Sequence, residues 1–196
     1  MIDAVFTYKD ENFKLDFSMN DGGLILLTGE NGSGKTTSLL CLSGFIPISE
    51  GRILINGIAI HDLYPSRRGI VYINHASYFE NMSGRKHVET AQHSERSLTY
   101  RIIDDFGILE NTRVRDMSQG NKVRVSLATA VNSRPRVILL DEVISAISDV
   151  DNLMEITLNY SREMKFDVIV VTHGQENMNG VSHHYEISNG KTARLF

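Results

Sequence analysis

The segment Gly29-Glu30-Asn31-Gly32-Ser33-Gly34-Lys35-Thr36 decides the fold class of this chain, because it satisfies the pattern G-x-x-x-x-G-K-[ST] at every fixed position. It follows the apolar run 24–27, which is typical of a buried strand, and precedes the run 37–42, which suits a helix. A glycine-rich turn between a strand and a helix directs backbone N–H groups at phosphate oxygens, and the helix N-terminus adds a favourable dipole. The segment therefore predicts a phosphate-binding loop within an α/β fold.

The side chains of this loop indicate a nucleotide bound together with magnesium. Lys35 would place a full positive charge on the phosphates, and Thr36 would offer its hydroxyl to Mg²⁺. The glycines let the backbone turn its N–H groups inward. We predict that eight residues hold the nucleotide here: Gly29, Asn31, Gly32, Ser33, Gly34, Lys35, Thr36 and Thr37.

Two further apolar runs end in polar side chains that suit the same ligand. The run 137–140 ends in Asp141 and Glu142, and the run 168–171 ends in Thr172-His173. Open α/β sheets place their ligands at the carboxyl ends of the strands. We predict that Asp141 holds Mg²⁺ through its water shell and that Glu142 polarises a water for attack on the γ-phosphate. Solvated strand-end acids are the competing interpretation for Asp141 and Glu142. His173 is a candidate γ-phosphate contact, although a single histidine taken in isolation is more often structural.

Composition limits the number of domains, the compartment and the kinds of partner that we expect for this chain. The chain has 196 residues, of which 41% are hydrophobic and 22% charged, and its formal net charge of -4 provides no general attraction to nucleic acid. The single cysteine, Cys41, lies in an apolar run and is predicted to be a core residue in a reducing compartment. No run approaches the roughly 20 apolar residues that span a bilayer, and no signal peptide is recognisable. We expect one domain without direct membrane insertion and without a nucleic-acid partner.

The order of patterns along the chain predicts a mixed sheet with an antiparallel β layer and a short helical subdomain. Apolar residues alternate over 13–19, which is typical of a half-buried strand, and the dipeptides Asn56-Gly57 and Asn189-Gly190 indicate tight hairpins. Between about 83 and 117 the chain becomes polar, and its apolar residues follow a helical face at Leu98, Ile102, Ile103 and Phe106. Short basic pairs such as Arg67-Arg68, and the histidines His87, His183 and His184, are predicted to be solvated.

A third motif connects these features to a known family. The segment 117–128, Met-Ser-Gln-Gly-Asn-Lys-Val-Arg-Val-Ser-Leu-Ala, resembles the LSGGQ signature and following helix of the nucleotide-binding domain of ABC (ATP-binding cassette) ATPases. A plain amphipathic helix with a serine cap is the competing interpretation. The resemblance implies that Ser118 and Gly120 face the γ-phosphate held by another protomer, so that two ATP molecules are buried in a head-to-tail dimer.

The resemblance covers nearly the whole chain and implies a P-loop NTPase core. It gives a single domain over 1–196, with the core at about 1–78 and 128–196 and the helical subdomain at about 79–127. It implies that Tyr8 stacks on adenine, with Phe6 as the competing aromatic. It also implies ATP and Mg²⁺ as cofactors, a homodimer or heterodimer, and a transmembrane permease subunit docked in a groove from about Phe79 to Val88. The chain would then lie in the cytoplasm, peripheral on the inner face of the membrane.

Several positions depart from the family pattern. The family has a glutamine that reaches Mg²⁺ where this chain has Asn74-His75, and we align His75 with it as a third catalytic candidate. The charge of an imidazole varies near neutral pH. Gln119 replaces the second signature glycine, and Asn121 replaces the final glutamine.

The segment after the acidic pair differs as well. Val143 stands where proline is usual, and Ser148 stands where an aspartate usually bridges two protomers, a role that Asp149 or Asp151 could take. Three functions follow from the resemblance: the ATP-hydrolysing subunit of a transporter, most similar to small-solute importers; a degenerate regulatory cassette with little hydrolysis; and a soluble ABC ATPase not linked to transport.

Overall fold

The computed structural model describes residues 1–11, 13–91, 95–172 and 178–196, and within them ten strands form one mixed sheet in the order β5-β4-β1-β2-β10-β9-β3-β8-β7-β6. The strands are β1 (Ile2–Lys9), β2 (Lys14–Asp21), β3 (Leu24–Thr28), β4 (Glu50–Ile55), β5 (Ile58–Ala59), β6 (Ile70–Ile73), β7 (Val137–Asp141), β8 (Asp167–Val171), β9 (His183–Ser188) and β10 (Lys191–Arg194). The α-helices are α1 (Lys35–Ser43), α2 (Gly84–Glu89), α3 (Arg96–Asp105), α4 (Gln119–Asn132) and α5 (Val150–Met164).

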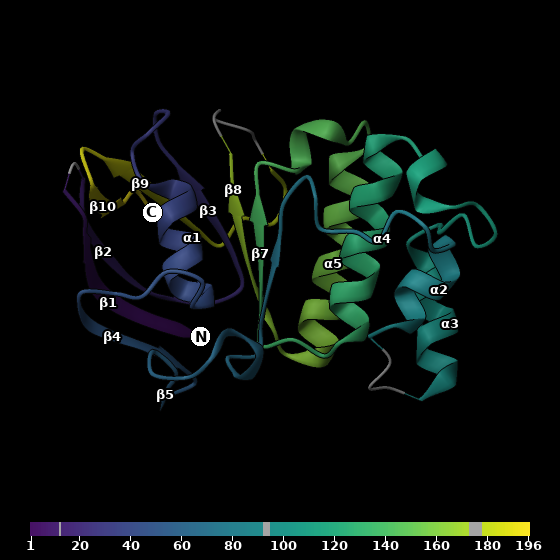
Figure 1. Cartoon of the computed structure of the whole chain (residues 1–196), viewed down its shortest axis with the longest axis horizontal. Coiled ribbons are helices and arrows are strands. Elements are labelled where there is room, and N and C mark those ends of the chain that lie inside the picture. The colour runs from purple at the N-terminus through teal and green to yellow at the C-terminus, as the bar shows by residue number, and fades with distance from the viewer. Residues whose placement is uncertain (12, 92–94, 173–177) are drawn as a thin grey trace.

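The sheet joins a parallel half to a largely antiparallel half, as the sequence predicted. Strands β3, β8, β7 and β6 pair in parallel, whereas β1 pairs antiparallel with both β2 and β4. In Figure 1 the antiparallel strands and α1 lie at one end, α4 and α5 lie beside β7, and α2 and α3 lie at the far end. The predicted α/β fold with an antiparallel layer and a helical part is therefore confirmed.

The central strands are buried on both faces. In β7, Ile138 and Leu140 belong to the core beneath α4 and α5, while Val137 and Leu139 belong to the core that includes α1. Successive side chains of a strand point to opposite faces, so a strand covered on both sides needs a continuous apolar run. This is why the apolar run 137–140 lacks polar alternation.

Both Asn-Gly dipeptides form the predicted hairpin turns. The φ angles are 51° and 77° at Asn56 and Gly57, and 49° and 69° at Asn189 and Gly190. Two successive positive φ values give the turn whose twist matches that of the flanking antiparallel strands. The first turn joins β4 to β5 and the second joins β9 to β10.

The helical part follows the predicted periodicity, with one difference at its boundary. Ile102 and Ile103 of α3 are buried, and so is the stripe formed by Val123, Leu127 and Val131 along α4. Helix α4 runs continuously from Gln119 to Asn132, across the expected boundary at 127. The same helix thus contributes its first half to the helical part and its second half to the packing on the sheet.

The prediction that Arg68, His87 and His184 are solvated is wrong. Arg68 is 5% exposed, His87 is 3% exposed, and His184 is also buried. The guanidinium of Arg68 donates hydrogen bonds to carbonyl oxygens near the end of α1 and in the loop before β6, at distances of 2.6–3.0 Å: Cys41, Leu42, His61 and Leu63. Carbonyls at a helix C-terminus lack intrahelical partners, and a cation there is favourable. Cys41 is buried as predicted, and burial raises the pKa of its thiol to about 11.

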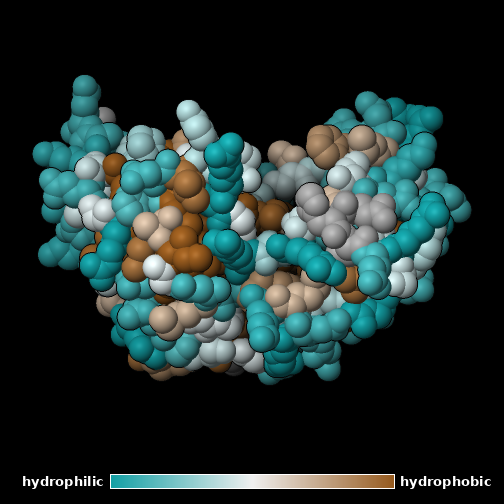
Figure 2. Space-filling model, turned by 90° about the horizontal axis from the view of Figure 1, so that it is seen from below, coloured by the Kyte–Doolittle hydropathy of each residue, from teal (hydrophilic) through white to brown (hydrophobic). Residues whose placement is uncertain are grey.

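The surface is mostly polar, with local exceptions. Figure 2 shows apolar side chains gathered over the part that contains the antiparallel strands, and a hollow between that part and the helical part. Exposed apolar side chains include Phe45, Ile58, Tyr64 and Phe79. Within the described residues, no helix combines the length and apolar character needed to cross a membrane.

Candidate functional site

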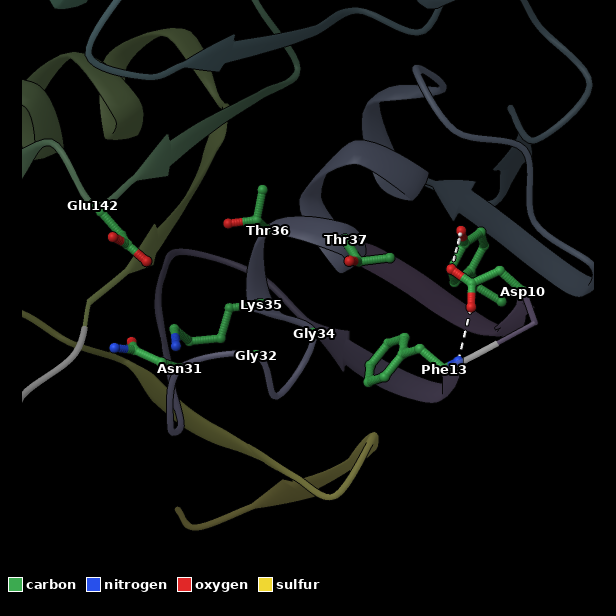
Figure 3. A pocket seen from close by; sticks show the side chains of 10 residues that line it. Asp10, Phe13, Asn31, Gly32, Gly34, Lys35, Thr36, Thr37 and Glu142 are labelled. Atoms are coloured by element: carbon green, nitrogen blue, oxygen red, sulfur yellow. Dashed lines mark hydrogen bonds between the residues drawn. The ribbon is translucent and has the colours of Figure 1, made fainter.

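The predicted phosphate loop borders a cavity of about 640 Å³ at the N-terminus of α1. Figure 3 shows Glu142, Lys35, Asn31 and the Thr36 hydroxyl on one side of this helix end, with Phe13 and Asp10 on the other side. The cavity thus has a charged end and an end with aromatic side chains. It is lined by Tyr8, Asp10, Phe13, Asn31, Gly32, Gly34, Lys35, Thr36, Thr37 and Glu142.

Two glycines shape the loop because neither position has room for a side chain. Gly29 has a φ of 145°, and a Cβ there would lie 2.2 Å from the carbonyl oxygen of Ile187. Gly34 has a φ of 110°, and its Cβ would lie 2.7 Å from the ring of Phe13. Only glycine adopts such angles without a steric cost. The close approach holds the loop against β9 and the β1–β2 hairpin, and it keeps the start of α1 open to the cavity.

Lys35 is positioned by the loop itself. The side chain is 4% exposed, and Nζ donates to the carbonyl oxygens of Gly29 (2.8 Å) and Glu30 (2.9 Å). Burial lowers the pKa of Lys35, while the nearby charges of Glu142 and Asp141 oppose that shift. A buried ammonium without a directly bonded anion is electrostatically costly. A phosphate group in the cavity would supply the missing negative charge.

Ser33 lies on the other side of the loop. Its hydroxyl is buried and has no hydrogen-bond partner among the described residues. It lines a neighbouring cavity of about 540 Å³ together with Glu30, Asn31 and residues of the β9–β10 hairpin. Ser33 is therefore a residue of the phosphate loop that faces the neighbouring cavity, and it does not line the main cavity.

Asp141 and Thr36 meet at the end of β7, and they fit a magnesium ion. The Thr36 hydroxyl donates to Asp141 Oδ1 at 3.2 Å, and the Tyr72 hydroxyl donates to Oδ2 at 2.6 Å. Mg²⁺ prefers oxygen ligands and usually keeps several waters, so it needs only one or two protein groups beside the phosphates of a nucleotide. No group of three or more His, Cys, Asp or Glu side chains in the described ranges could hold a metal alone. The donor set suits a metal that arrives with its nucleotide.

Glu142 adopts an unusual backbone conformation at the edge of the cavity. Its φ is 59°, in the left-handed region that non-glycine residues seldom adopt, and its N–H donates to Val171 O at 3.1 Å. Such strain persists only where surrounding structure fixes it, and it is enriched at functional sites. Val143, which follows, is fully buried and anchors the chain in the core. The turn directs the Glu142 side chain toward the phosphate loop (Figure 3).

Of the other sequence-predicted catalytic and signature residues, those within the described ranges do not line this cavity. His173 lies outside the described residues. His75 is exposed in the turn after β6, where its carbonyl oxygen accepts a hydrogen bond from Gln119 Nε2 at 3.4 Å. Ser118 caps α4 by accepting from the N–H of Asn121, and Gly120 lies in the first turn of that helix. Among the described residues, the turn after β6 and the start of α4 therefore meet through the hydrogen bond between Gln119 and His75, away from the cavity.

The aromatic end of the cavity differs from the expectation in one respect. Phe6 is 2% exposed and stacks on Phe17 with ring centroids 4.9 Å apart, so the competing assignment of Phe6 to the base is wrong. Tyr8 lines the cavity, and so does Phe13, which sequence reasoning missed. Asp10 fixes both, because it accepts from the Tyr8 hydroxyl at 3.0 Å and from the Phe13 N–H at 2.7 Å. No signal in the sequence indicated Phe13, because its place follows from the strand register in which Tyr8 pairs with Leu15.

A second, apolar cavity of about 380 Å³ lies between β6 and the helical part. Phe79 and His87 line it as the predicted groove requires, whereas Val88 is buried in the core. Other lining residues come from β6, from the turn after it and from α4, and they include Val71, Ile73, Ala76, Tyr78, Thr129 and Ala130. The groove is therefore wider than the segment from Phe79 to Val88.

His87 is a titratable side chain in the wall of this groove. The Thr129 hydroxyl donates to Val125 O at 2.7 Å, so its oxygen accepts from His87 Nδ1–H at 2.8 Å. The imidazole is then neutral with Nε2 as an acceptor, and Nε2 has no partner among the described residues. Burial lowers the pKa of His87, because a charged imidazole would be poorly solvated there.

Acidification is expected to lower the free energy of unfolding through His87. The unfolded chain takes up a proton near the ordinary histidine pKa of 6.5, whereas the folded chain resists it until its lowered pKa is reached. This contribution is therefore complete above about pH 6.5 and is lost as the pH falls below that value. Urea unfolding between pH 7.5 and 5.5 should give a steeper decline for the wild type than for His87→Gln. Parallel declines would contradict a buried neutral imidazole.

Comparison with known proteins places this site in a family. The family model described as ABC transporter matches residues 13–145, which include the phosphate loop, the signature segment and the acidic strand end. The chain therefore belongs to the ABC transporter family, and its fold is that of the ATP-binding cassettes.

Among sequence relatives, the chain is similar to import ATP-binding proteins. It is 30% identical over 176 residues to the spermidine/putrescine import ATP-binding protein PotA of Legionella pneumophila (strain Paris), covering 83% of this chain and 48% of the relative. It is 29% identical over 156 residues to the hypophosphite import ATP-binding protein HtxD of Stutzerimonas stutzeri, covering 68% and 46% respectively. The chain thus spans about half the length of the curated relatives it matches.

Solved structures of cassettes share the fold over almost the entire chain. The structure of cbiO1 from Clostridium perfringens, part of the ABC transporter complex cbiONQ, matches with a TM-score of 0.82 at 19% identity, covering 98% of this chain and 86% of that one. The dimeric bacterial ABC transporter cassette MJ0796 matches with a TM-score of 0.78 at 20% identity, covering 100% and 99%. At these identities the likeness establishes the fold.

Proposed function

We propose that this chain binds ATP with Mg²⁺ and hydrolyses it to power a transporter. The observation that carries the proposal is the meeting of Lys35, Thr36 and Glu142 at one end of the cavity beside the N-terminus of α1, with Asp141 hydrogen-bonded to Thr36. Lys35 and the loop N–H groups bind the phosphates, and Thr36 and Asp141 hold the metal. The metal supplies charge neutralisation at the phosphates.

Glu142 would act on the attacking water. Its carboxylate lines the cavity, and it can accept the proton that the water loses as it attacks the γ-phosphate. The aromatic end, with Tyr8 and Phe13, would contact the base, since flat rings stack favourably on a purine. The charged and aromatic ends lie on opposite sides of the start of α1, as an extended nucleotide requires (Figure 3).

We infer a two-ATP dimer from the placement of the signature residues. Ser118 and Gly120 lie at the N-terminus of α4 but do not line the cavity of their own chain. A helix N-terminus is an anion site, so these residues are placed to serve the nucleotide of a second cassette. Asp149 forms an ion pair with Arg124 of α4 within the chain, which leaves Ser148 and Asp151 as the remaining candidates for a bridge between protomers.

The proposed membrane partner would occupy the apolar groove. A groove of about 380 Å³ with apolar walls suits an amphipathic helix of a permease subunit. The names of the relatives support import of a small solute. We accordingly place the cassette at the cytoplasmic face of a membrane, held there by its permease, with a core of about 1–78 and 128–196 and a helical subdomain of about 79–127.

The dimer provides the direct test. With hydrolysis blocked by Glu142→Gln, Mg-ATP is expected to shift the mass in solution from one chain to two, because the closed state can no longer decay. ADP should leave one chain, and Lys35→Ala should remove the response to ATP. A variant that binds ATP yet stays at one chain would contradict self-association and would assign the second signature segment to a different cassette.

A regulatory cassette with little hydrolysis is the second candidate. It is favoured by the exposed position of His75, which does not line the cavity where the family glutamine would be needed. The rate of ATP turnover of the wild-type protein separates the two candidates, since a regulatory cassette would bind ATP and release almost no phosphate.

A further inference from the structure

The Tyr72 hydroxyl contacts the proposed metal carboxylate from outside the phosphate loop. It donates to Asp141 Oδ2 at 2.6 Å, while the Thr36 hydroxyl donates to Oδ1 at 3.2 Å. Tyr72 and Asp141 lie far apart in the chain, on β6 and β7, and the parallel pairing of these strands brings them together. Each oxygen of the carboxylate therefore has a donor on a different element.

The ring of Tyr72 is held as firmly as its hydroxyl. Tyr72 packs against the core that contains α1, and its ring meets that of Phe45 edge-on at 6.1 Å between centroids. The next residues on either side, Val71 and Ile73, lie in or against the opposite core. A half-buried aromatic fixed by packing has little freedom to rotate its hydroxyl away from Asp141. Burial and the hydrogen bond to Asp141 both raise the pKa of Tyr72, so its hydroxyl remains a donor.

We propose that Tyr72 is a positioning residue for magnesium: it holds Oδ2 of Asp141 so that Oδ1, beside Thr36, faces the incoming metal and its waters. The inference rests on the proposed magnesium site. It requires no contact between Tyr72 and the nucleotide. Groups that orient a metal ligand by hydrogen bonding contribute to metal affinity, and their removal typically costs about 10- to 100-fold.

The chain offers a matched control. The Tyr160 hydroxyl donates to Asp105 Oδ2, also at 2.6 Å, and Tyr160 is buried in the other core, away from the cavity. Tyr72→Phe and Tyr160→Phe each remove one hydroxyl from a tyrosine–aspartate pair of the same length. A general effect of losing such a bond on stability should appear in both variants, and thermal unfolding measures it.

The test is a magnesium titration of binding, followed with a fluorescent non-hydrolysable ATP analogue well below the lowest unfolding midpoint. In EDTA, both variants should bind the analogue as the wild type does. The Mg²⁺ concentration that gives half of the full gain in affinity should rise about 10-fold in Tyr72→Phe and stay unchanged in Tyr160→Phe. Electron paramagnetic resonance of Mn²⁺ bound with the analogue should report the same loss without any turnover.

The possible outcomes distinguish a failure of the proposed metal site from a failure of the proposed role of Tyr72. If the affinity of the wild-type protein for the analogue does not depend on Mg²⁺, the proposed metal site and this inference are both overturned. A wild-type response that Tyr72→Phe keeps in full, or that Tyr160→Phe loses equally, would overturn the role of Tyr72 alone.

Discussion

Replacing Glu142 with glutamine is expected to lower the rate of ATP hydrolysis by about 10²- to 10⁴-fold, which is the usual contribution of a positioned general base. Glutamine has nearly the same shape but cannot accept a proton from the attacking water. The backbone turn at Glu142, with its φ of 59°, includes an N–H bond to Val171 that the substitution leaves in place, so the variant should fold normally. Phosphate release under saturating Mg-ATP measures the change.

Glu30→Gln is the control for this experiment. Glu30 lies in the same loop and lines the neighbouring cavity, so its replacement removes one negative charge near the site without changing the strand end. It should alter turnover by less than about threefold, because an exposed charge has a modest and screened influence. Equal turnover of the wild type and Glu142→Gln would contradict the catalytic role and would favour a regulatory cassette.

Replacing Arg68 with methionine is expected to lower the free energy of unfolding by roughly 2–4 kcal/mol, since buried acceptors that lose their donor cost about 1–3 kcal/mol each and neighbouring ones partly relax. Methionine fills much of the same volume but leaves the four carbonyls without the guanidinium. They lie near the end of α1 and in the loop before β6: Cys41, Leu42, His61 and Leu63. Urea unfolding followed by circular dichroism provides the measurement.

Arg67→Met is a control one residue away. Arg67 is exposed in the short 3₁₀ turn before Arg68, and a surface substitution of this kind should change stability by no more than about 0.5 kcal/mol. Arg68→Lys should fall between the two, because a lysine keeps the charge but lacks the planar fork that reaches several carbonyls at once. Equal stability of Arg67→Met and Arg68→Met would mean that the buried hydrogen bonds add nothing.

The features that the sequence predicted well are those encoded locally. The phosphate loop needs glycines at fixed spacing, so Gly29 and Gly34 are visible without any tertiary information. The runs at β3, β7 and β8 have no polar alternation because both of their faces are covered. The Asn-Gly dipeptides predict their turns directly, because both residues adopt the positive φ angles that such turns need. The acidic pair Asp141-Glu142 was equally easy to recognise in the sequence, since charges interrupt a buried strand only at its end.

The features that the sequence did not reveal depend on contacts between distant segments. Arg68 resembles any surface arginine until the end of α1 is brought beside it, and His87 resembles a solvated histidine until α4 covers it. Phe13 follows a polar turn and enters the cavity only because β1 and β2 pair in one particular register. The burial of Phe6 is decided in the same way by its stacking on Phe17. Periodicity indicates which face a residue occupies but does not identify what covers that face.

Strand β6 lies at the margin of the sheet, where, within the described ranges, it pairs with β7 alone. Val71, Tyr72 and Ile73 all line the apolar groove, and Tyr72 also packs against the opposite core and bonds Asp141. A segment seated in the groove would therefore press on a four-residue element whose far side sets the orientation of a metal carboxylate. Within the described residues, β6 is thus both a wall of the groove and the element that carries the Tyr72 hydroxyl to the proposed metal carboxylate, so one short strand connects the two sites.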